Sequence, residues 1–226
     1  MPVLLLHGAL GSRTQLAPLA AALGQRPPQA MDLSGHGACP LPPEGLSFAH
    51  FLDDIDAALD AAGWEQAHLF GYSMGGYAAL LYAARRPGRV RSVATLGTKL
   101  NWDRAGLERE LRMLQPATMR AKVPAFVAQL AAAHGADRWE ALVHATAQLI
   151  TGLHERPLLD AATLATIACP VLLCVGDQDR TAVPEDTLAA ARRIPHAGTL
   201  VLPRTGHPVG AVHLPLLLGH LEAFWG

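Results

Sequence analysis

The chain has 226 residues, enough for one sizeable core; half of them are hydrophobic and 16% are charged. Its 18 basic and 19 acidic residues are scattered and give a net charge of −1, which argues against nucleic-acid or anionic-membrane partners. No apolar run approaches the roughly 20 residues of a membrane span, and the first run, Val3–Leu6, is too short for a signal peptide. The three cysteines make no disulfide framework. We therefore expect a cytoplasmic globular protein, either a monomer or a homodimer.

Short apolar runs alternate with amphipathic segments through the first hundred residues. The runs predict strands at residues 3–6, 29–31, 67–70 and 90–96. Helices are expected at residues 14–23, from the N-cap residue Ser47 to Gly63, and at residues 77–86. This alternation predicts βαβ units and therefore a parallel sheet.

The alternation stops at Gly97. From residue 100 to 159 the pattern predicts only helices, three in number, and the third begins at a capping box formed by Asp137 and Glu140. Strands are expected again at residues 170–175 and 199–202, with helices at 184–193 and 213–225. Residues 1–99 and 161–226 are therefore expected to form the core, and residues 100–160 a helical cap over the carboxyl edge of the sheet.

One glycine-rich turn has the sequence Gly71-Tyr72-Ser73-Met74-Gly75-Gly76 and lies between an expected strand and an expected helix. This context is typical of a nucleophile elbow, in which a sharp turn exposes a serine at a helix N-terminus. The free N–H groups of that terminus favour a developing negative charge. Ser73 is therefore the candidate nucleophile. The alternative is a turn whose serine only caps the helix.

Four loops follow predicted strands, at residues 7–12, 71–76, 176–180 and 203–208. The carboxyl ends of parallel strands lie along one edge, so these loops are expected to converge. They bring together a serine, two carboxylates (Asp177 and Asp179) and His207. Acyl transfer needs these groups: a hydroxyl that attacks, an imidazole that takes its proton, and a carboxylate that orients the imidazole.

The motifs HGALGS, DLSGHG, GYSMGG, GDQD and TGHP occur in this order at the expected strand ends, and nearly the whole chain resembles the α/β-hydrolase superfamily. The resemblance implies these roles: nucleophile Ser73, acid Asp179, base His207, and oxyanion-hole N–H groups from Met74 and Ala9. Leu10 is the alternative second donor. It also implies an α/β fold that lacks the family's first two strands, with a mostly parallel sheet of about six strands flanked by helices.

Several other polar residues have simpler explanations. Asp177 competes with Asp179 for the role of acid, but hydrogen bonding within its own loop explains Asp177 better. His7, Asp32 and His36 are expected to hold their turns together. The eleven histidines are dispersed without metal-binding spacing, so we expect neither a metal nor another cofactor. The ten-residue spacing of three of them, His134, His144 and His154, is interpreted as a coincidence.

Three residues are candidates for the substrate pocket. Lys99 either faces the cleft, where it meets an anionic group, or is solvated at the hinge of the cap. Trp102 and Trp139 either pack inside the cap or form an apolar wall of the pocket.

The predicted function is that of a serine hydrolase, similar to a carboxylesterase, which cleaves a small to medium hydrophobic ester through an acyl-enzyme on Ser73. The expected partner is a small-molecule substrate. One alternative is a module with this fold that binds a small ligand without efficient turnover. The other is a carbon–carbon bond hydrolase or lyase that uses the same three side chains.

Overall fold

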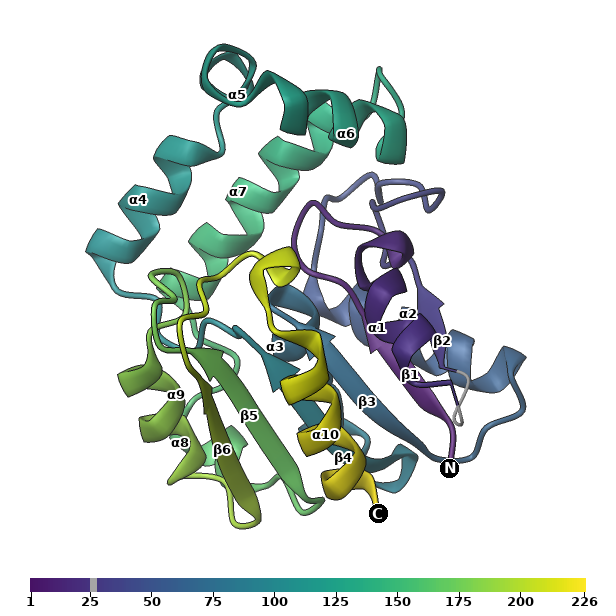
Figure 1. Cartoon of the computed structure of the whole chain (residues 1–226). Coiled ribbons are helices and arrows are strands. Elements are labelled where there is room, and N and C mark those ends of the chain that lie inside the picture. Colours follow the sequence, from purple (N-terminus) through teal and green to yellow (C-terminus); the bar gives the residue numbers. More distant parts are fainter. Residues whose placement is uncertain (25–27) are drawn as a thin grey trace.

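The computed structural model describes residues 1–24 and 28–226, which contain a parallel sheet in the order β2-β1-β3-β4-β5-β6 (Figure 1). Every strand pair among these residues is parallel. The strands are β1 Val3–Leu6, β2 Gln29–Met31, β3 Ala67–Tyr72, β4 Val90–Leu96, β5 Val171–Gly176 and β6 Ala197–Leu202. The predicted fold class, an α/β protein with about six mostly parallel strands, is confirmed.

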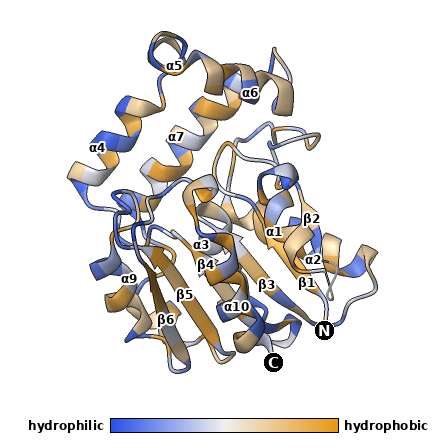
Figure 2. Ribbon diagram, in the orientation of Figure 1, coloured by the Kyte–Doolittle hydropathy of each residue, from blue (hydrophilic) through white to orange (hydrophobic). Residues whose placement is uncertain are grey.

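The central strands are buried on both faces. All four residues of β1 are fully buried, and alternate side chains enter different apolar clusters: Leu4 and Leu6 lie in one, Val3 and Leu5 in the other. This is the two-residue repeat of a strand with helices on both sides. In Figure 2 β1 and β5 are correspondingly orange, the colour of hydrophobic residues.

Helices cover both faces of the sheet. One face packs against α1 Ala17–Ala22 and α10 Leu214–Trp225. The other packs against α2 Phe48–Ala61, α3 Met74–Arg85, α8 Ala161–Ala165 and α9 Pro184–Ala191. Short 3-10 turns lie at Arg13–Leu16, Pro87–Arg89 and Val209–Ala211. As predicted, Ser47 caps α2, because its hydroxyl accepts the N–H of His50 at 3.2 Å.

Between β4 and α8 the chain forms four helices, which we call the insert: α4 Arg104–Met113, α5 Pro116–Lys122, α6 Pro124–His134 and α7 Trp139–Glu155. They lie above the carboxyl ends of the strands (Figure 1). The sequence predicted three helices here. The structure has four because Pro116 and Pro124 each begin a new helix, at the position where proline needs no N–H acceptor.

The predicted capping box of α7 is wrong. The N-cap residue is Arg138, and no side chain bonds to the first turn. Glu140 instead forms an ion pair with Arg120 of α5, so a contact between helices replaces the local one. No helix in residues 1–24 and 28–226 is long and apolar enough to cross a membrane.

Candidate active site

Ser73 occupies a sharp turn between the last residue of β3, Tyr72, and the first of α3, Met74. Its φ of 52° is unusual for a residue other than glycine and costs on the order of 1–2 kcal/mol. Two hydrogen bonds hold it: its N–H donates to the Leu96 carbonyl at 2.8 Å, and its carbonyl accepts the Thr98 hydroxyl at 3.2 Å. The Ser73 side chain forms no hydrogen bond that caps α3. Its hydroxyl is therefore not used as a helix cap.

The flanking glycines let the strand and the helix approach closely. A Cβ atom on Gly71 would overlap the carbonyl of Gly75, and one on Gly75 would overlap the carbonyl of Leu6. Both obstacles are backbone atoms, which cannot rotate away. The turn that exposes Ser73 therefore depends on glycine at both positions.

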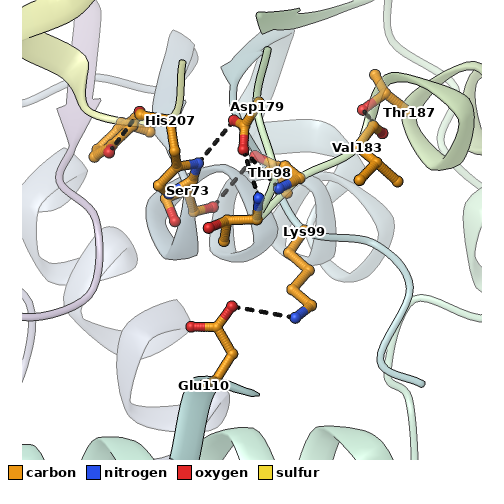
Figure 3. Close-up of polar contacts among 11 residues, drawn as sticks. Ser73, Thr98, Lys99, Glu110, Asp179, Val183, Thr187 and His207 are labelled. Atoms are coloured by element: carbon orange, nitrogen blue, oxygen red, sulfur yellow. Dashed lines mark hydrogen bonds and ion pairs between the residues drawn. The ribbon is translucent and has the colours of Figure 1, made fainter. Parts of the chain in front are cut away.

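His207 and Asp179 are hydrogen-bonded to each other (Figure 3). The Nδ1–H of His207 donates to Asp179 Oδ2 at 2.8 Å, and the other oxygen, Oδ1, accepts the N–H groups of Thr181 and Ala182, both at 2.8 Å. Asp179 is almost fully buried. Because a carboxylate only accepts, the His207 proton is on Nδ1, which leaves Nε2 able to take a proton.

Ser73 and His207 line the same cavity. No hydrogen bond between them is formed in the described part of the chain. Hydrogen bonds of this kind are often long before a substrate binds and shorten in the complex.

Two residues that the sequence reasoning did not identify support this pair. Gly97 has a φ of +61°, and a Cβ atom there would lie 3.1 Å from Asp179 Oδ2 and 3.3 Å from the His207 ring. The Tyr72 hydroxyl donates to the carbonyl of His207 at 3.0 Å. Burial and the nearby charge of Asp179 raise the pKa of Tyr72 to about 12, so it keeps the proton that it donates.

The second carboxylate of this loop, Asp177, has a different environment. It is exposed, and its Oδ1 accepts the N–H of Thr205 at 3.0 Å. Backbone N–H groups of Arg204 and Thr205 lower its pKa by stabilising the ionised form. Asp177 therefore joins two neighbouring loops, whereas Asp179 contacts His207.

The candidate oxyanion donors differ in what their N–H groups already bind. Ala9 and Met74 both line the cavity, and neither amide has an acceptor among the described residues. Met74 is the first residue of α3, where helical N–H groups lack an intrahelical partner. The Leu10 N–H, by contrast, donates to Nε2 of His36 at 3.3 Å. The amides of these two cavity-lining residues are therefore free, whereas the amide of Leu10 is already used.

Three buried histidines hold the loop that carries Ala9 and Leu10. Neighbouring rings lie 4.9 Å apart for His7 and His36, and 5.8 Å apart for His36 and His134. His134 comes from α6; its Nε2–H donates to the Leu10 carbonyl at 3.0 Å, and its Nδ1 accepts the Gly37 N–H at 2.8 Å. No regular spacing in the sequence indicates this contact between segments 124 residues apart.

The other two rings are fixed in the same way. His7 accepts the Leu33 N–H at 3.1 Å and donates to the Gly8 carbonyl at 2.8 Å. His36, besides accepting from Leu10, donates to the Ser34 carbonyl at 3.0 Å. Burial lowers the pKa of His7 to about 4 and also lowers the pKa values of His36 and His134. The three rings are therefore neutral at pH 7, each with one tautomer fixed by the backbone.

The cavity has a volume of about 430 Å³ and lies between the loops at the strand ends and the insert. Two of the three predicted pocket residues, Lys99 and Trp102, line it. Trp139 does not line it: it packs with Leu130 and Val143 inside the insert, because the apolar face of α7 there meets α6, and this is the first of the two alternatives expected for it. The solvated alternative for Lys99 is wrong, since Lys99 is only 8% exposed.

Among residues 1–24 and 28–226, no three His, Cys, Asp or Glu side chains are arranged to hold a metal ion. In the histidine cluster all six ring nitrogens already bond to the backbone.

Known proteins resemble this chain in sequence and in structure. The family model of the alpha/beta hydrolase fold matches residues 1–150. A pimeloyl-(acyl-carrier protein) methyl ester esterase of Xanthomonas campestris pv. campestris is 31% identical over an alignment 227 residues long. This alignment covers 91% of this chain and 87% of the relative. A 2-succinyl-6-hydroxy-2,4-cyclohexadiene-1-carboxylate synthase of Yersinia pseudotuberculosis is 35% identical over 112 residues, 49% of this chain and 40% of the relative. The crystal structure of NosK from Streptomyces actuosus superposes with a TM-score of 0.85 at 28% identity and covers 99% of this chain and 96% of NosK.

Proposed function

Because the chain belongs to the α/β-hydrolase family, we propose that it is a serine hydrolase that cleaves a small to medium hydrophobic ester through an acyl-enzyme on Ser73. The observation that carries this proposal is the buried Asp179–His207 hydrogen bond at the edge of the cavity that Ser73 also lines. The similarity to a methyl ester esterase over most of both chains supports an ester as the substrate.

In the proposed reaction His207 Nε2 takes the proton of the Ser73 hydroxyl as Oγ attacks the ester carbonyl. The negative charge on the former carbonyl oxygen is stabilised by the N–H groups of Ala9 and Met74. The C–O bond then breaks, and the alcohol leaves with the proton from His207. Water, deprotonated by His207, attacks the acyl-enzyme and releases the acid, which returns Ser73 to its starting state. Asp179 stabilises the imidazolium in both halves.

We further propose that residues 100–160 act as a cap and that residues 1–99 and 161–226 form the core. The cap would exclude water from the reaction and supply one wall of the pocket. Its contribution to the cavity is largely apolar, with Glu110 and Thr146 as the polar exceptions, and consists of Trp102, Glu110, Met113, Leu114, Phe126, Thr146, Leu149, Ile150 and Leu153. This lining supports a hydrophobic substrate.

A second candidate is a reaction other than ester hydrolysis that uses the same side chains. The similarity to a synthase over about half of this chain favours it, because that relative is named for a reaction other than ester hydrolysis. Such an enzyme would still depend on Ser73 but would not hydrolyse simple esters.

The test compares wild type with Ser73→Ala on p-nitrophenyl esters of increasing acyl length. We expect turnover that falls at least about 10³-fold in the variant, because the nucleophile is lost while the fold is kept. Ser92→Ala is the matched control: it removes the hydrogen bond between Ser92 and His68 near the amino end of β4, the end opposite the cavity, and should cost about 1–3 kcal/mol of stability with turnover unchanged. Equal turnover in Ser73→Ala would refute the proposal. No turnover by folded wild type would favour the second candidate or a ligand-binding module.

A further inference from the structure

One charged pair lies in the otherwise largely apolar cavity. Lys99, three residues after β4, and Glu110, on α4, point toward each other from opposite walls (Figure 3). The distance from Nζ to Oε1 is 3.3 Å, and the two side chains are 8% and 16% exposed. Among the described residues that line the cavity, no other Lys, Arg, Asp or Glu is present. A charged pair in such a site marks a place where polar recognition is concentrated.

The pair leaves hydrogen-bonding capacity unused. In the described part of the chain Glu110 Oε2 has no hydrogen-bond partner, and Lys99 makes one hydrogen bond although an ammonium has three donors. Lys99 also lies 4.8 Å from the centre of the Trp102 ring, whose Nε1–H is buried without a partner. The site therefore offers spare donors from Lys99 and a spare acceptor from Glu110, with the Trp102 ring beside the ammonium group.

The charges select against charged ligand groups of either sign. A carboxylate that reached Lys99 would lie beside Glu110, and an ammonium that reached Glu110 would lie beside Lys99; each contact between like charges is unfavourable in a half-buried site. A neutral amide meets neither penalty. Its carbonyl can accept from Lys99 while its N–H donates to Glu110.

We propose that Lys99 and Glu110, beside the Trp102 ring, form a specificity site for an uncharged amide carried by the substrate on a chain remote from the ester. The inference rests on the proposed ester hydrolysis and narrows its substrate class. The substrate is then an ester with an apolar chain and one amide group, and esters with a charged group in that position are rejected.

The test uses methyl esters of straight-chain acids of graded length, each ending in a methyl, carboxamide, carboxylate or ammonium group. We expect wild type to show a kcat/KM for the carboxamide at least about tenfold above either charged ester, a difference that corresponds to about 1.4 kcal/mol. Glu110→Gln should raise kcat/KM for the carboxylate ester at least about tenfold relative to kcat/KM for the carboxamide, because the charge of Lys99 is then unpaired. Lys99→Met should raise kcat/KM for the ammonium ester relative to the carboxamide, because the charge of Glu110 is then unpaired.

Glu108→Gln is the matched control, since Glu108 lies on the same helix and pairs with the exposed Arg104 at 3.0 Å. It should leave the ranking of the four esters unchanged. The proposal is overturned if Glu110→Gln and Lys99→Met also leave it unchanged, in which case the pair only ties α4 to the end of β4.

A binding measurement separates this proposal from the proposed reaction. Titration calorimetry on Ser73→Ala with hexanamide, hexanoate and hexylammonium needs no turnover. Tighter binding of hexanamide, with the order changed by Glu110→Gln, supports the amide site even if no ester is hydrolysed. The amide site is overturned if Ser73→Ala, which keeps Lys99 and Glu110, binds hexanoate or hexylammonium as tightly as hexanamide or more tightly.

Discussion

Replacement of His134 by alanine tests whether the insert holds the candidate oxyanion loop in place. The side chain is fully buried and makes two hydrogen bonds, one to the Leu10 carbonyl at 3.0 Å and one from the Gly37 N–H at 2.8 Å. His134→Ala leaves both backbone groups buried and unpaired, at about 1–3 kcal/mol each. The expected loss is therefore about 2–6 kcal/mol of unfolding free energy, or roughly 4–24 °C in Tm for a chain of this size.

The same change should lower the rate. Leu10 has a left-handed φ of 58°, and its N–H and carbonyl are held by His36 and His134 respectively. Without His134 the Leu10–Gly11 peptide is held only by the Gly11 N–H, which donates to the Gly8 carbonyl at 3.0 Å, so the loop is less rigid and the neighbouring Ala9 N–H is positioned less precisely. Complete loss of one oxyanion donor costs about 10²–10³-fold in kcat, so a misaligned donor should cost about 10- to 100-fold, with KM little changed.

The assay is steady-state hydrolysis of a p-nitrophenyl ester together with thermal unfolding. His144→Ala, on the exposed surface of α7, makes the same chemical change and should alter the unfolding free energy by less than about 0.5 kcal/mol. His134→Asn keeps one donor and one acceptor and should recover part of kcat. The reasoning is refuted if His134→Ala matches His144→Ala in both Tm and kcat.

Two further predictions follow from the same geometry. Asp179→Asn should lower kcat by about 10⁴-fold, because an amide does not fix the tautomer of His207 as a carboxylate does. Asp177→Asn should change kcat less than about threefold. Similar losses in both variants would contradict the assignment of Asp179 as the residue that orients His207. Acid should destabilise the fold through the buried histidines: the folded-state pKa of His7 is lowered from 6.5 to about 4, so the unfolded chain binds more protons and stability falls as pH drops through that window. His7 alone should cost about 2 kcal/mol between pH 7 and pH 5. Urea titrations at the two pH values measure this loss, and a protein no less stable at pH 5 would show that the rings are not buried as neutral groups.

The catalytic candidates were predictable because they belong to strand ends. Apolar runs identify strands, the alternation with helices makes the sheet parallel, and a parallel sheet brings the loops after its strands to one edge. That logic is sufficient to bring Asp179 and His207 together, although 28 residues separate them. It does not distinguish Asp179 from Asp177, which lie in the same loop; that choice rests on the resemblance to the family and on the hydrogen bonding expected of Asp177 within its loop.

The insert was less predictable for a physical reason. A helical repeat identifies the apolar face of a helix but not the element that this face meets. Trp139 lies on the apolar face of α7, yet its neighbours are in α6 and not in the cavity. Glu110 resembles any polar residue of a surface helix in the sequence. Only the position of α4 in the fold brings it to Lys99, in the segment that follows β4. For His134 the bonded partners lie in loops near residues 10 and 37, which no local pattern connects to α6.

This difference in predictability bears on which part of the molecule sets the reaction. The motifs at the strand ends belong to the family as a whole, so they cannot by themselves distinguish an esterase from a synthase. The cavity wall that faces them comes from the insert. The insert also supplies Glu110, which lines the cavity, and His134, which bonds to the loop that carries Ala9 and Leu10. One insert residue balances the charge of Lys99, and the other holds the loop beside Ser73. Substitutions in the insert should therefore change both specificity and rate, and substrate class is better sought from the insert than from the elbow motif.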